Sequence, residues 1–239
     1  METRINKFLS EVGYCSRRAA DKLLEQGRIT LNGNVPELGT KVKPDDEVRV
    51  DGKLVGEGRR ERLVYLAFHK PVGIVCTTDS QREEKNIIDF IGYPTRIFPI
   101  GRLDKPSEGL IFLTNDGDIV NKILRAKNHH EKEYIVTVDR IIIGNFIRDM
   151  GNGVPVLDTV TNPCFVEQTG DREFRIILTQ GLNRQIRRMC EYFGYRVGRL
   201  KRVRIMNMYL DMPVGTWRDF KREELEEMHR LIGDSSKTY

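Results

Sequence analysis

The stretch from Phe98 to Asp118, FPIGRLDKPSEGLIFLTNDGD, places one carboxylate, Asp104, between two cations, Arg102 and Lys105. Apolar runs lie on both sides of this acid and predict two strands joined by a short loop. The residues Thr114-Asn115-Asp116-Gly117 predict a turn, because Asn and Asp bond their own backbone and Gly tolerates positive φ. On spacing alone, a surface salt bridge in a loop is the better interpretation of Asp104.

The motif GRLDKPSEGL followed by FLTNDGD resembles the central motif of the RNA pseudouridine synthases. In having Gly before Arg-Leu-Asp, the motif is similar to that of the RsuA/RluB/RluE/RluF branch of the family. The resemblance implies that Asp104 is the essential catalytic carboxylate. With it we expect an α+β fold, in which a small N-terminal S4-like domain precedes a larger domain. The larger domain would hold a mixed, mainly antiparallel sheet flanked by helices.

The composition predicts a folded protein. The chain has 239 residues, of which 39% are hydrophobic and 31% charged. This length fits one large domain, or a large domain plus a small one. The formal net charge of +5 favours a polyanionic partner, although many basic proteins bind no nucleic acid.

Motifs for metal ions, cofactors and membranes are missing from the sequence. The four cysteines form no C-x-x-C pair and no histidine stands at zinc-ligand spacing, so we expect reduced thiols and no metal. There is no P-loop or dinucleotide-binding glycine fingerprint, and we expect no cofactor. No apolar run approaches the roughly 18 residues of a membrane span, and the N-terminus lacks a signal-peptide core. We therefore expect a cytoplasmic protein.

The N-terminal segment predicts a small helical and β unit. Residues 4–26 carry two apolar stripes at helical spacing, and Ser16 is the expected N-cap of the second helix. The residues 29–31 predict a strand, which the turn Asn32-Gly33 would join to a second strand containing Val35. Residues 48–50 predict a further strand.

Five cations on or between these helices could meet RNA phosphates. They are Arg4, Lys7, Arg17, Arg18 and Lys22. Acids are interspersed, so a small domain with a solvated charged face is the alternative. The segments R-x-x-K-F-L-S, CSRRAAD and GRITLNG are similar to the S4 RNA-binding domain, which favours RNA binding. The charged stretch EGRRER, residues 57–62, predicts a linker, and we expect domains at 1–61 and 62–239.

The first part of the larger domain predicts strands and one exposed loop. Residues 63–78 are rich in β-branched and aromatic side chains, with His69 to Gly73 as the connection between strands. Residues 79–86 predict an exposed loop. The family's Lys-Pro-x-Gly motif matches at Lys70, which the resemblance makes a weaker candidate for holding the loop or a phosphate.

After the central motif, residues 119–125 predict a helix, and the segment HEKEYIVTVDR predicts a strand. A lone Tyr in a strand is usually a core residue. The segment 132–134 matches the family's Lys-x-Tyr motif, however, and the resemblance implies that Tyr134 is the active-site tyrosine. Residues 174–178 alternate as a further strand.

The segment from Gln180 to Arg204 is dense in cations and holds a single acid, Glu191. Its eight cations and its interleaved aromatic residues suit RNA through phosphate pairing and base stacking. A helix is expected over about 184–193, with Ile186, Met189 and Cys190 on its buried side. The motif N-R-Q-I-R-R-M resembles the family's arginine motif. This resemblance makes Arg184, Arg187 and Arg188 candidate site residues.

The resemblance assigns roles to these residues. Arg187 would pair with Asp104 and keep it ionised, and Tyr134 would stack on a uracil flipped out of the RNA. Arg102 would fill the space left by the flipped base or contact phosphate. Asp104 could act at C1′, C6 or C2′ of the uridine, and the sequence does not choose among these positions.

The predicted function is isomerisation of one uridine to pseudouridine in ribosomal RNA. The segments NHHEKEYIVTVD, GVPVLDTVTNPC and GLNRQIRRMCEYFGY are similar to RluF-type members, which modify 23S rRNA. The alternatives are the same chemistry on 16S rRNA or tRNA, and a non-catalytic rRNA-binding assembly factor. A short amphipathic helix should end the chain, and a monomer is the family expectation.

Overall fold

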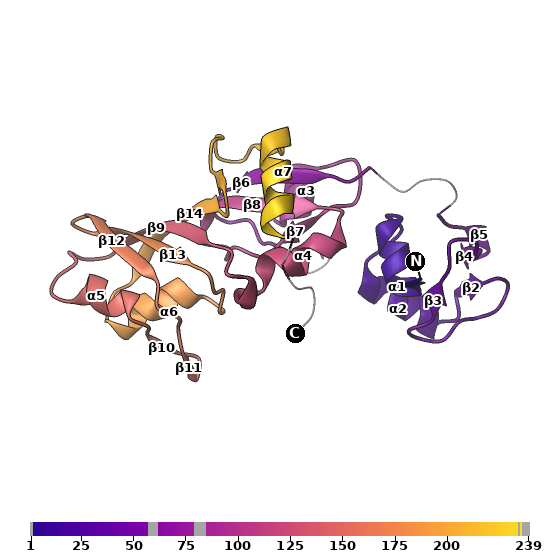
Figure 1. Ribbon diagram of the computed structural model, residues 1–239, viewed down its shortest axis with the longest axis horizontal. Coiled ribbons are helices and arrows are strands. Elements are labelled where there is room, and N and C mark those ends of the chain that lie inside the picture. Colours follow the sequence, from indigo (N-terminus) through magenta and orange to yellow (C-terminus); the bar gives the residue numbers. More distant parts are fainter. Residues whose placement is uncertain (1, 57–61, 79–84, 234, 236–239) are drawn as a thin grey trace. The chain divides into compact units, whose positions relative to one another are not determined.

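The computed structural model describes residues 2–56, 62–78, 85–233 and 235. The chain divides into two compact units, Met1–Leu63 and Val64–Tyr239. Apart from Arg62, the expected linker EGRRER lies outside the described residues. Each unit has its own apolar core. Figure 1 labels the helices and strands of both units.

The N-terminal unit combines two helices with short antiparallel strands. Its elements are β1 (Thr3–Arg4), α1 (Ile5–Glu11), α2 (Arg17–Glu25), β2 (Ile29–Leu31), β3 (Lys41–Val42), β4 (Val48–Val50) and β5 (Lys53–Leu54). As predicted, Ser16 caps α2, and its hydroxyl oxygen accepts a hydrogen bond from the Ala19 N–H at 3.1 Å. Ile5 and Leu9 of α1 pack with Leu24 of α2 over the strands.

The predicted hairpin after β2 is wrong in its second strand. Asn32 and Gly33 do form a turn with positive φ, but only a single bridge, from Leu31 to Asn34, follows it. Val35 is exposed and lies outside any described strand. The partner of β2 is β4, because Val48 and Val50 bring two buried side chains to the helices.

The C-terminal unit is built around one large sheet. Its elements are β6 (Tyr65–Lys70), α3 (Ile87–Ile91), β7 (Phe98–Ile100), β8 (Glu108–Thr114), α4 (Gly117–Leu124), the 3-10 turn η1 (Ala126–Asn128), β9 (Lys132–Val138), α5 (Phe146–Gly151), β10 (Pro155–Val156), β11 (Thr159–Val160), β12 (Phe165–Gly170), β13 (Glu173–Leu178), α6 (Gln185–Tyr192), β14 (Val197–Ile205), β15 (Met208–Tyr209), β16 (Trp217–Asp219) and α7 (Arg222–Leu231).

The sheet is mixed and mainly antiparallel, as predicted. Within the described residues its strand order is β12-β13-β9-β14-β8-β6-β16, with β15 paired to β14 and β7 paired to β8 (Figure 1). The β8–β14 pair is parallel, and the other pairs are antiparallel. This parallel joint connects the two halves of the sheet.

A glycine is required at the parallel joint. Gly109 has φ +120° and lies opposite Arg202 in the β8–β14 register. A Cβ at this position would lie 2.3 Å from the Arg202 carbonyl oxygen, well inside van der Waals contact. The two backbones can approach this closely because residue 109 has no side chain.

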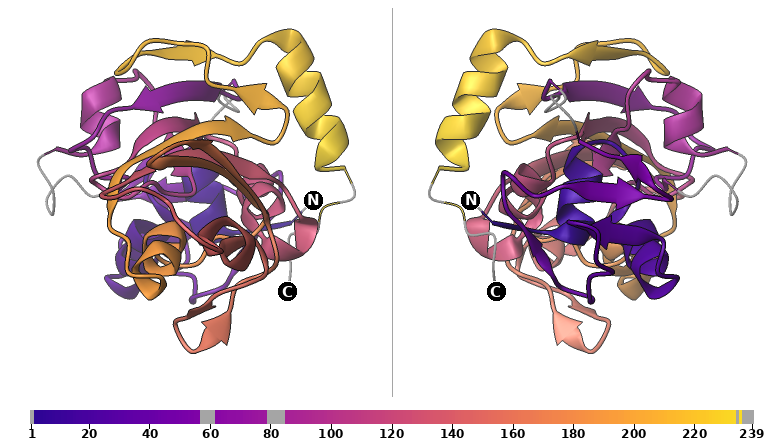
Figure 2. Two further views of the ribbon diagram at one scale, coloured as in Figure 1. Left: turned by 90° about the vertical axis from the view of Figure 1, so that its left-hand side faces the viewer. Right: turned by 90° about the vertical axis from the view of Figure 1, so that its right-hand side faces the viewer.

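Helices cover both faces of the sheet. On one face of β6 and β8, the side chains of Leu110 and Phe112 pack with α4 and α7. On the other face, Ile111 and Leu113 pack with α3, and Figure 2 shows α3 and α7 on opposite sides of these strands. All seven residues of β8 are buried, which explains its nearly continuous apolar sequence. Helices α5 and α6 cover the β9–β13 end of the sheet.

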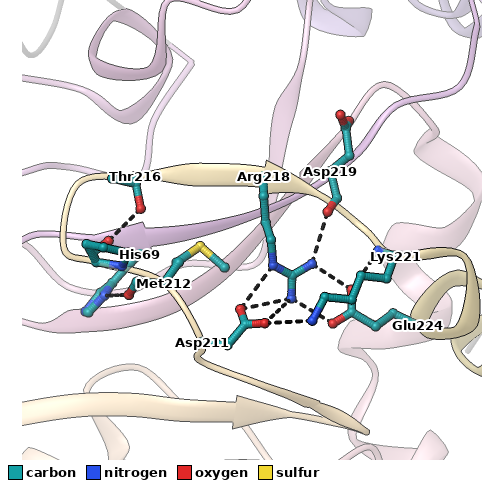
Figure 3. Close-up of polar contacts among 9 residues, drawn as sticks. His69, Asp211, Met212, Thr216, Arg218, Asp219, Lys221 and Glu224 are labelled. Carbon is teal, nitrogen blue, oxygen red and sulfur yellow. Dashed lines mark hydrogen bonds and ion pairs between the residues drawn. The ribbon is translucent and has the colours of Figure 1, made fainter.

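A polar cluster fastens the C-terminal helix to the sheet edge (Figure 3). The Arg218 guanidinium of β16 lies 2.9 Å from the Asp211 carboxylate and 2.7 Å from the Glu224 carboxylate of α7. Lys221 approaches the same Asp211 at 3.0 Å. His69 Nδ1 lies 2.9 Å from the Met212 carbonyl oxygen, and because a carbonyl can only accept, Nδ1 is the donor. These contacts close the chain back onto β6.

Two predictions near β6 are corrected by the structure. His69 and Lys70 belong to the strand and not to the connection, which begins at Pro71. The expected loop 79–86 lies outside the described residues except for Lys85 and Asn86. Asn86 is buried and caps α3, since its side-chain oxygen accepts bonds from the Ile88 and Asp89 N–H groups. The predicted helices over 119–125 and 184–193 and the terminal amphipathic helix are all present.

Candidate active site

Asp104 lies in the loop between β7 and β8, as the sequence predicted. The loop is held by its buried neighbour Leu103, whose N–H contacts the Cys76 sulfur at 3.3 Å. It closes with a bond from the Ser107 N–H to the Asp104 carbonyl at 2.9 Å. The Asp104 side chain remains 36% exposed, so its carboxylate can meet a ligand.

Arg187 reaches this loop from helix α6. Its guanidinium donates to the Ser107 hydroxyl and to the Pro106 carbonyl, each at 3.1 Å, and to the Val197 carbonyl at 3.2 Å. Its Nε lies 3.9 Å from the Asp104 carboxylate and is buried, with no hydrogen-bond partner among the described residues. Burial lowers the pKa of Arg187, Arg184 lowers it further, and Asp104 raises it. The expected Asp104–Arg187 ion pair is therefore present, in an open geometry that a bound substrate could tighten.

A cavity of about 320 Å³ opens beside this ion pair, and we call it the Asp104 cavity. Its apolar lining comes from the three apolar clusters of the C-terminal unit: Ile100 and Phe112 from one, Leu178 and Leu200 from a second, and Leu103 from a third. A concave site with apolar walls and a few convergent polar groups is the usual form of a small-ligand pocket.

The polar lining of the Asp104 cavity is strongly cationic. Among the described residues, Asp104 is its one carboxylate. The cations that line it are Arg102, Lys132, Arg184, Arg187 and Arg202. Such a balance favours a ligand that carries or develops negative charge.

Tyr134 lines the cavity from strand β9, and its neighbour across the sheet is Arg202 of β14. The Arg202 guanidinium carbon lies 6.0 Å from the centre of the Tyr134 ring, within cation–π range. Arg202 Nε donates to the Leu110 carbonyl at 2.6 Å, while its Nη2 is buried with no hydrogen-bond partner among the described residues. Tyr134 and Arg202 thus line the same cavity.

Lys132 is a cavity residue whose role the sequence reasoning missed. It stands two positions before Tyr134, a spacing that places both side chains on one face of β9. It is buried, and its ammonium donates to the His130 carbonyl at 3.1 Å. Burial, with a smaller contribution from Arg202, lowers the pKa of Lys132 to about 8. The strand spacing within the Lys-x-Tyr motif was the signal that could have found it.

Three further arginine and lysine candidates divide between the cavity and its surroundings. Arg184 lines the cavity mouth at the start of α6, exposed and with φ +52°, a left-handed conformation that side chains adopt at a cost. Arg188 lies outside the cavity lining and donates to the Asn183 carbonyl at 3.1 Å. Lys70 is fully buried and donates to the Pro71 and Ile74 carbonyls, each at 2.8 Å. It holds the loop after β6 and cannot contact phosphate from that position.

The prediction that the cations of the segment 180–204 suit pairing with RNA phosphates is wrong in part. Arg202 and Arg204 are buried, and acids from other strands compensate for the scarcity of local ones. Arg204 pairs with Glu133 at 2.8 Å and also with Glu131, and Arg199 pairs with Glu108 at 2.6 Å. Tyr195 is a core residue, whereas Tyr192 is exposed. Counting acids along the sequence cannot detect partners on neighbouring strands.

The candidate RNA contacts of the N-terminal unit lie on its surface. Arg4, Arg17, Arg18 and Lys22 are exposed. Lys7 is partly buried and forms an ion pair with Glu11 at 3.2 Å. Helices α1 and α2 are joined by a bond from the Asn6 amide to Asp21 at 2.9 Å, which orients these cations on one scaffold.

Metal-binding and membrane-spanning features are absent from the described part of the chain. No group of three or more His, Cys, Asp or Glu side chains there is arranged to hold a metal ion. No helix in those ranges is both long and apolar enough to cross a bilayer. The four cysteines, all within the described ranges, are free thiols in this structure.

Comparison with known proteins agrees with this architecture. Residues 64–192 match the family described as RNA pseudouridylate synthase, and residues 3–48 match the S4 domain. The chain belongs to the RNA pseudouridine synthases and carries an N-terminal S4 domain. It is an enzyme of the isomerase class.

Particular relatives narrow the comparison. Dual-specificity RNA pseudouridine synthase RluF of Escherichia coli O157:H7 is 57% identical over 98% of this chain and 80% of that protein. Ribosomal large subunit pseudouridine synthase B of Bacillus subtilis (strain 168) is 32% identical over 98% of both chains. A solved crystal structure of a pseudouridylate synthase superimposes with a TM-score of 0.69 at 27% identity. The match covers 94% of this chain and 99% of that one.

Proposed function

We propose that this enzyme isomerises a uridine of 23S ribosomal RNA to pseudouridine, with Asp104 as the catalytic carboxylate. The observation that carries the proposal is the Asp104 cavity, in which one carboxylate faces Arg187 and Tyr134. The similarity to ribosomal large subunit pseudouridine synthase B supports a large-subunit target.

The reaction exchanges the N1–C1′ bond of uridine for a C5–C1′ bond. The target base must leave its stack to reach a recessed carboxylate, so base flipping is part of the proposal. Arg187 supplies the positive counter-charge to the Asp104 carboxylate, with its Nε 3.9 Å away. Tyr134 stacks on the flipped uracil. Its phenol can help to remove the C5 proton once C5 has bonded to C1′, by accepting that proton while its own O–H proton passes to water. Exposed Arg102 and Arg184 meet the flanking phosphates.

A second RNA substrate is favoured by the names of the RluF relatives, which describe them as dual-specificity enzymes. For this chain we propose ribosomal RNA as the main substrate and a tRNA as the candidate for the second. The protein would act in the cytoplasm as a monomer. Gel filtration with light scattering tests the last point, and a stable dimer would contradict it.

Stop mapping identifies the substrate. RNA from cells lacking the protein is treated with carbodiimide and reverse-transcribed, and each pseudouridine is scored as a stop. We expect one stop in 23S rRNA to disappear and then to be restored by the wild-type gene. Disappearance of a stop in 16S rRNA alone would contradict the large-subunit assignment, and the additional disappearance of a tRNA stop would support dual specificity.

The variant Asp104→Asn tests the catalytic role. It keeps the size of the side chain and removes its charge, so RNA binding should change by no more than about three-fold while product formation disappears. Release of tritium from C5-labelled uridine measures turnover. The matched control is Asp89→Asn on α3, since Asp89 is absent from the cavity lining. Wild-type turnover by Asp104→Asn would rule out this assignment.

A further inference from the structure

Tyr134 is flanked inside the Asp104 cavity by two buried cations with unfilled hydrogen-bonding capacity. Lys132 lies two positions away on the same face of β9, and Arg202 lies directly opposite on β14. Both residues are largely buried, with exposed fractions of 7% for Lys132 and 4% for Arg202. Both cations therefore belong to the buried wall of the cavity on either side of Tyr134.

These two cations are poorly satisfied by the protein itself. Arg202 Nη2 is buried and has no partner in the described residues. Among the described residues, the Lys132 ammonium donates one hydrogen bond, to the His130 carbonyl. Two of its three protons therefore have no acceptor in that part of the protein. A buried donor without a hydrogen-bond acceptor costs free energy. A bound ligand would supply the missing acceptors. The depth of these two cations also separates them from Arg102 and Arg184, which are exposed at the mouth and suit phosphates.

Every route open to Asp104 places negative charge on the uracil. If the carboxylate bonds to C1′, the N1–C1′ electron pair leaves with the base, which becomes an anion delocalised over N1, O2 and O4. If the carboxylate removes the C2′ proton, elimination breaks the same bond and releases the same anion. If it adds to C6, the C5–C6 electron pair moves to C5 and O4 as an enolate. In each case charge reaches O4.

We infer that Lys132 and Arg202 form a cationic clamp for the uracil oxygens and stabilise the negative charge that develops on the base after Asp104 acts. The inference rests on the proposed function and adds two catalytic residues to it. In a buried, apolar-walled cavity, fixed positive charges facing a developing anion act more strongly than in water. The clamp also retains the detached base while it turns from N1 to C5. As C5 bonds to C1′, the Asp104–C1′ bond breaks in the first route, and in the second C2′ regains its proton from Asp104. In the third route the Asp104–C6 bond breaks afterwards. The C5 proton then leaves and N1 gains one, so the carboxylate is regenerated and atoms and charge balance.

The decisive experiment separates binding from chemistry. Single-turnover tritium release from C5-labelled 23S transcript is measured at saturating enzyme for wild type, Lys132→Met and Arg202→Met. We expect the rate to fall about 100-fold or more in each variant while the Kd for RNA stays within about three-fold. The matched control is Lys201→Met, which removes the same charge next to Arg202 but outside the cavity lining and should leave the rate unchanged.

A pH profile gives a readout that a structural role would not produce. The rate of the wild type should decline above about pH 8, as Lys132 loses its proton. Lys132→Arg keeps the charge and should extend activity to higher pH. The other charged or titratable groups that line this cavity are Arg102, Asp104, Tyr134, Arg184, Arg187 and Arg202.

The outcomes are distinguishable. A wild type that releases no tritium from any RNA would defeat the proposed function itself. An active wild type with an equally fast Lys132→Met variant would overturn the clamp, as would an effect confined to Kd, which would make these residues phosphate anchors. Lys132→Met replaces a buried ammonium by a side chain of similar volume, so its fold should persist. It carries the test even if Arg202→Met does not fold.

Discussion

At the scale of single residues, Arg187 joins structure to chemistry. It binds the Ser107 hydroxyl and two backbone carbonyls around the Asp104 loop, and its Nε faces the carboxylate at 3.9 Å. Arg187→Lys keeps the charge but cannot reproduce the fork of donors. We expect turnover to fall by about 100-fold or more, because the loop loses its support as well as its counter-ion. The tritium-release assay at saturating RNA measures this decrease, and near-wild-type turnover would show that charge alone suffices.

The buried Lys132 should make stability depend on pH. Its folded pKa is about 8, below the ordinary 10.5, so the unfolded chain binds more protons between these two values. Stability should therefore rise with pH through this window, and the full cost of burying the charge applies below pH 8. Lys132→Met removes that cost, and at pH 7 we expect its free energy of unfolding to exceed the wild-type value by about 1–3 kcal/mol.

Urea unfolding of both proteins from pH 7 to pH 10.5 measures the difference. The gap between Lys132→Met and wild type should narrow as the pH rises. A difference in free energy of unfolding that stays constant across this range would contradict a lowered pKa of Lys132. A more stable but inactive variant would indicate that function, and not stability, maintains the charge at this position.

At the scale of elements, the parallel β8–β14 joint positions the site. Gly109 lies in β8, the strand that follows the Asp104 loop, and the joint places Arg202 of β14 opposite it. Gly109→Ala would force a Cβ to within 2.3 Å of the Arg202 carbonyl oxygen. We expect destabilisation of about 3 kcal/mol or more, since backbone on both sides must move.

Thermal unfolding of Gly109→Ala checks this expectation. Gly170→Ala is the control, because φ there is not in the left-handed region and the added Cβ would meet its nearest neighbour at an ordinary 3.6 Å. The control should change stability by no more than about 0.5 kcal/mol. Equal losses of stability in the two variants would mean that the backbones of β8 and β14 can move apart at this joint without cost.

The docking of α7 offers a second test at this scale. Arg218→Met leaves two carboxylates without their shared guanidinium, and we expect stability to fall by about 1–3 kcal/mol. Arg222→Met is the matched control, because Arg222 is 86% exposed and its 2.7 Å pair with Glu226 lies on one helix surface. That control should cost about 0–0.5 kcal/mol. Neither residue lines the Asp104 cavity, so turnover at low temperature should survive in both.

At the scale of the whole molecule, the two units should divide recognition from chemistry. Each has its own apolar core, and Asp104, Tyr134 and Arg187 belong to the second. Deleting residues 1–61 should spare the fold and turnover at saturating RNA while weakening binding to structured RNA. Each phosphate that is no longer neutralised should flatten the salt dependence of binding by roughly 0.7 to 0.9 log units per log unit of salt.

A salt titration of RNA binding measures that slope. Removing about three to five phosphate-binding cations of α1 and α2 would be readily visible. A truncated protein that no longer folds would mean that the units depend on each other. An unchanged slope would mean that the S4 unit does not bind this RNA. Reversal of Arg17 and Arg18 to Glu in the full chain provides a control that leaves the fold intact.

Local sequence patterns were sufficient to predict the elements and the family. Apolar periodicity was enough for α1, α2, α6 and the strands around Asp104, because these patterns depend on neighbours two to four positions away. The Ser16 cap and the Asn32-Gly33 turn were likewise local. The motifs around Asp104, Tyr134 and Arg187 named the residues that the fold brings to one cavity.

Long-range packing, by contrast, controls which cations lie on the surface of the protein. Arg202 and Arg204 resemble the other arginines of their segment, yet cross-strand neighbours bury both, and Glu131 and Glu133 of a distant segment neutralise Arg204. The partner of β2 and the interior position of Lys70 were equally inaccessible to sequence reasoning. Burial and charge compensation depend on residues far apart in the chain, and a linear pattern carries no information about which of them will meet.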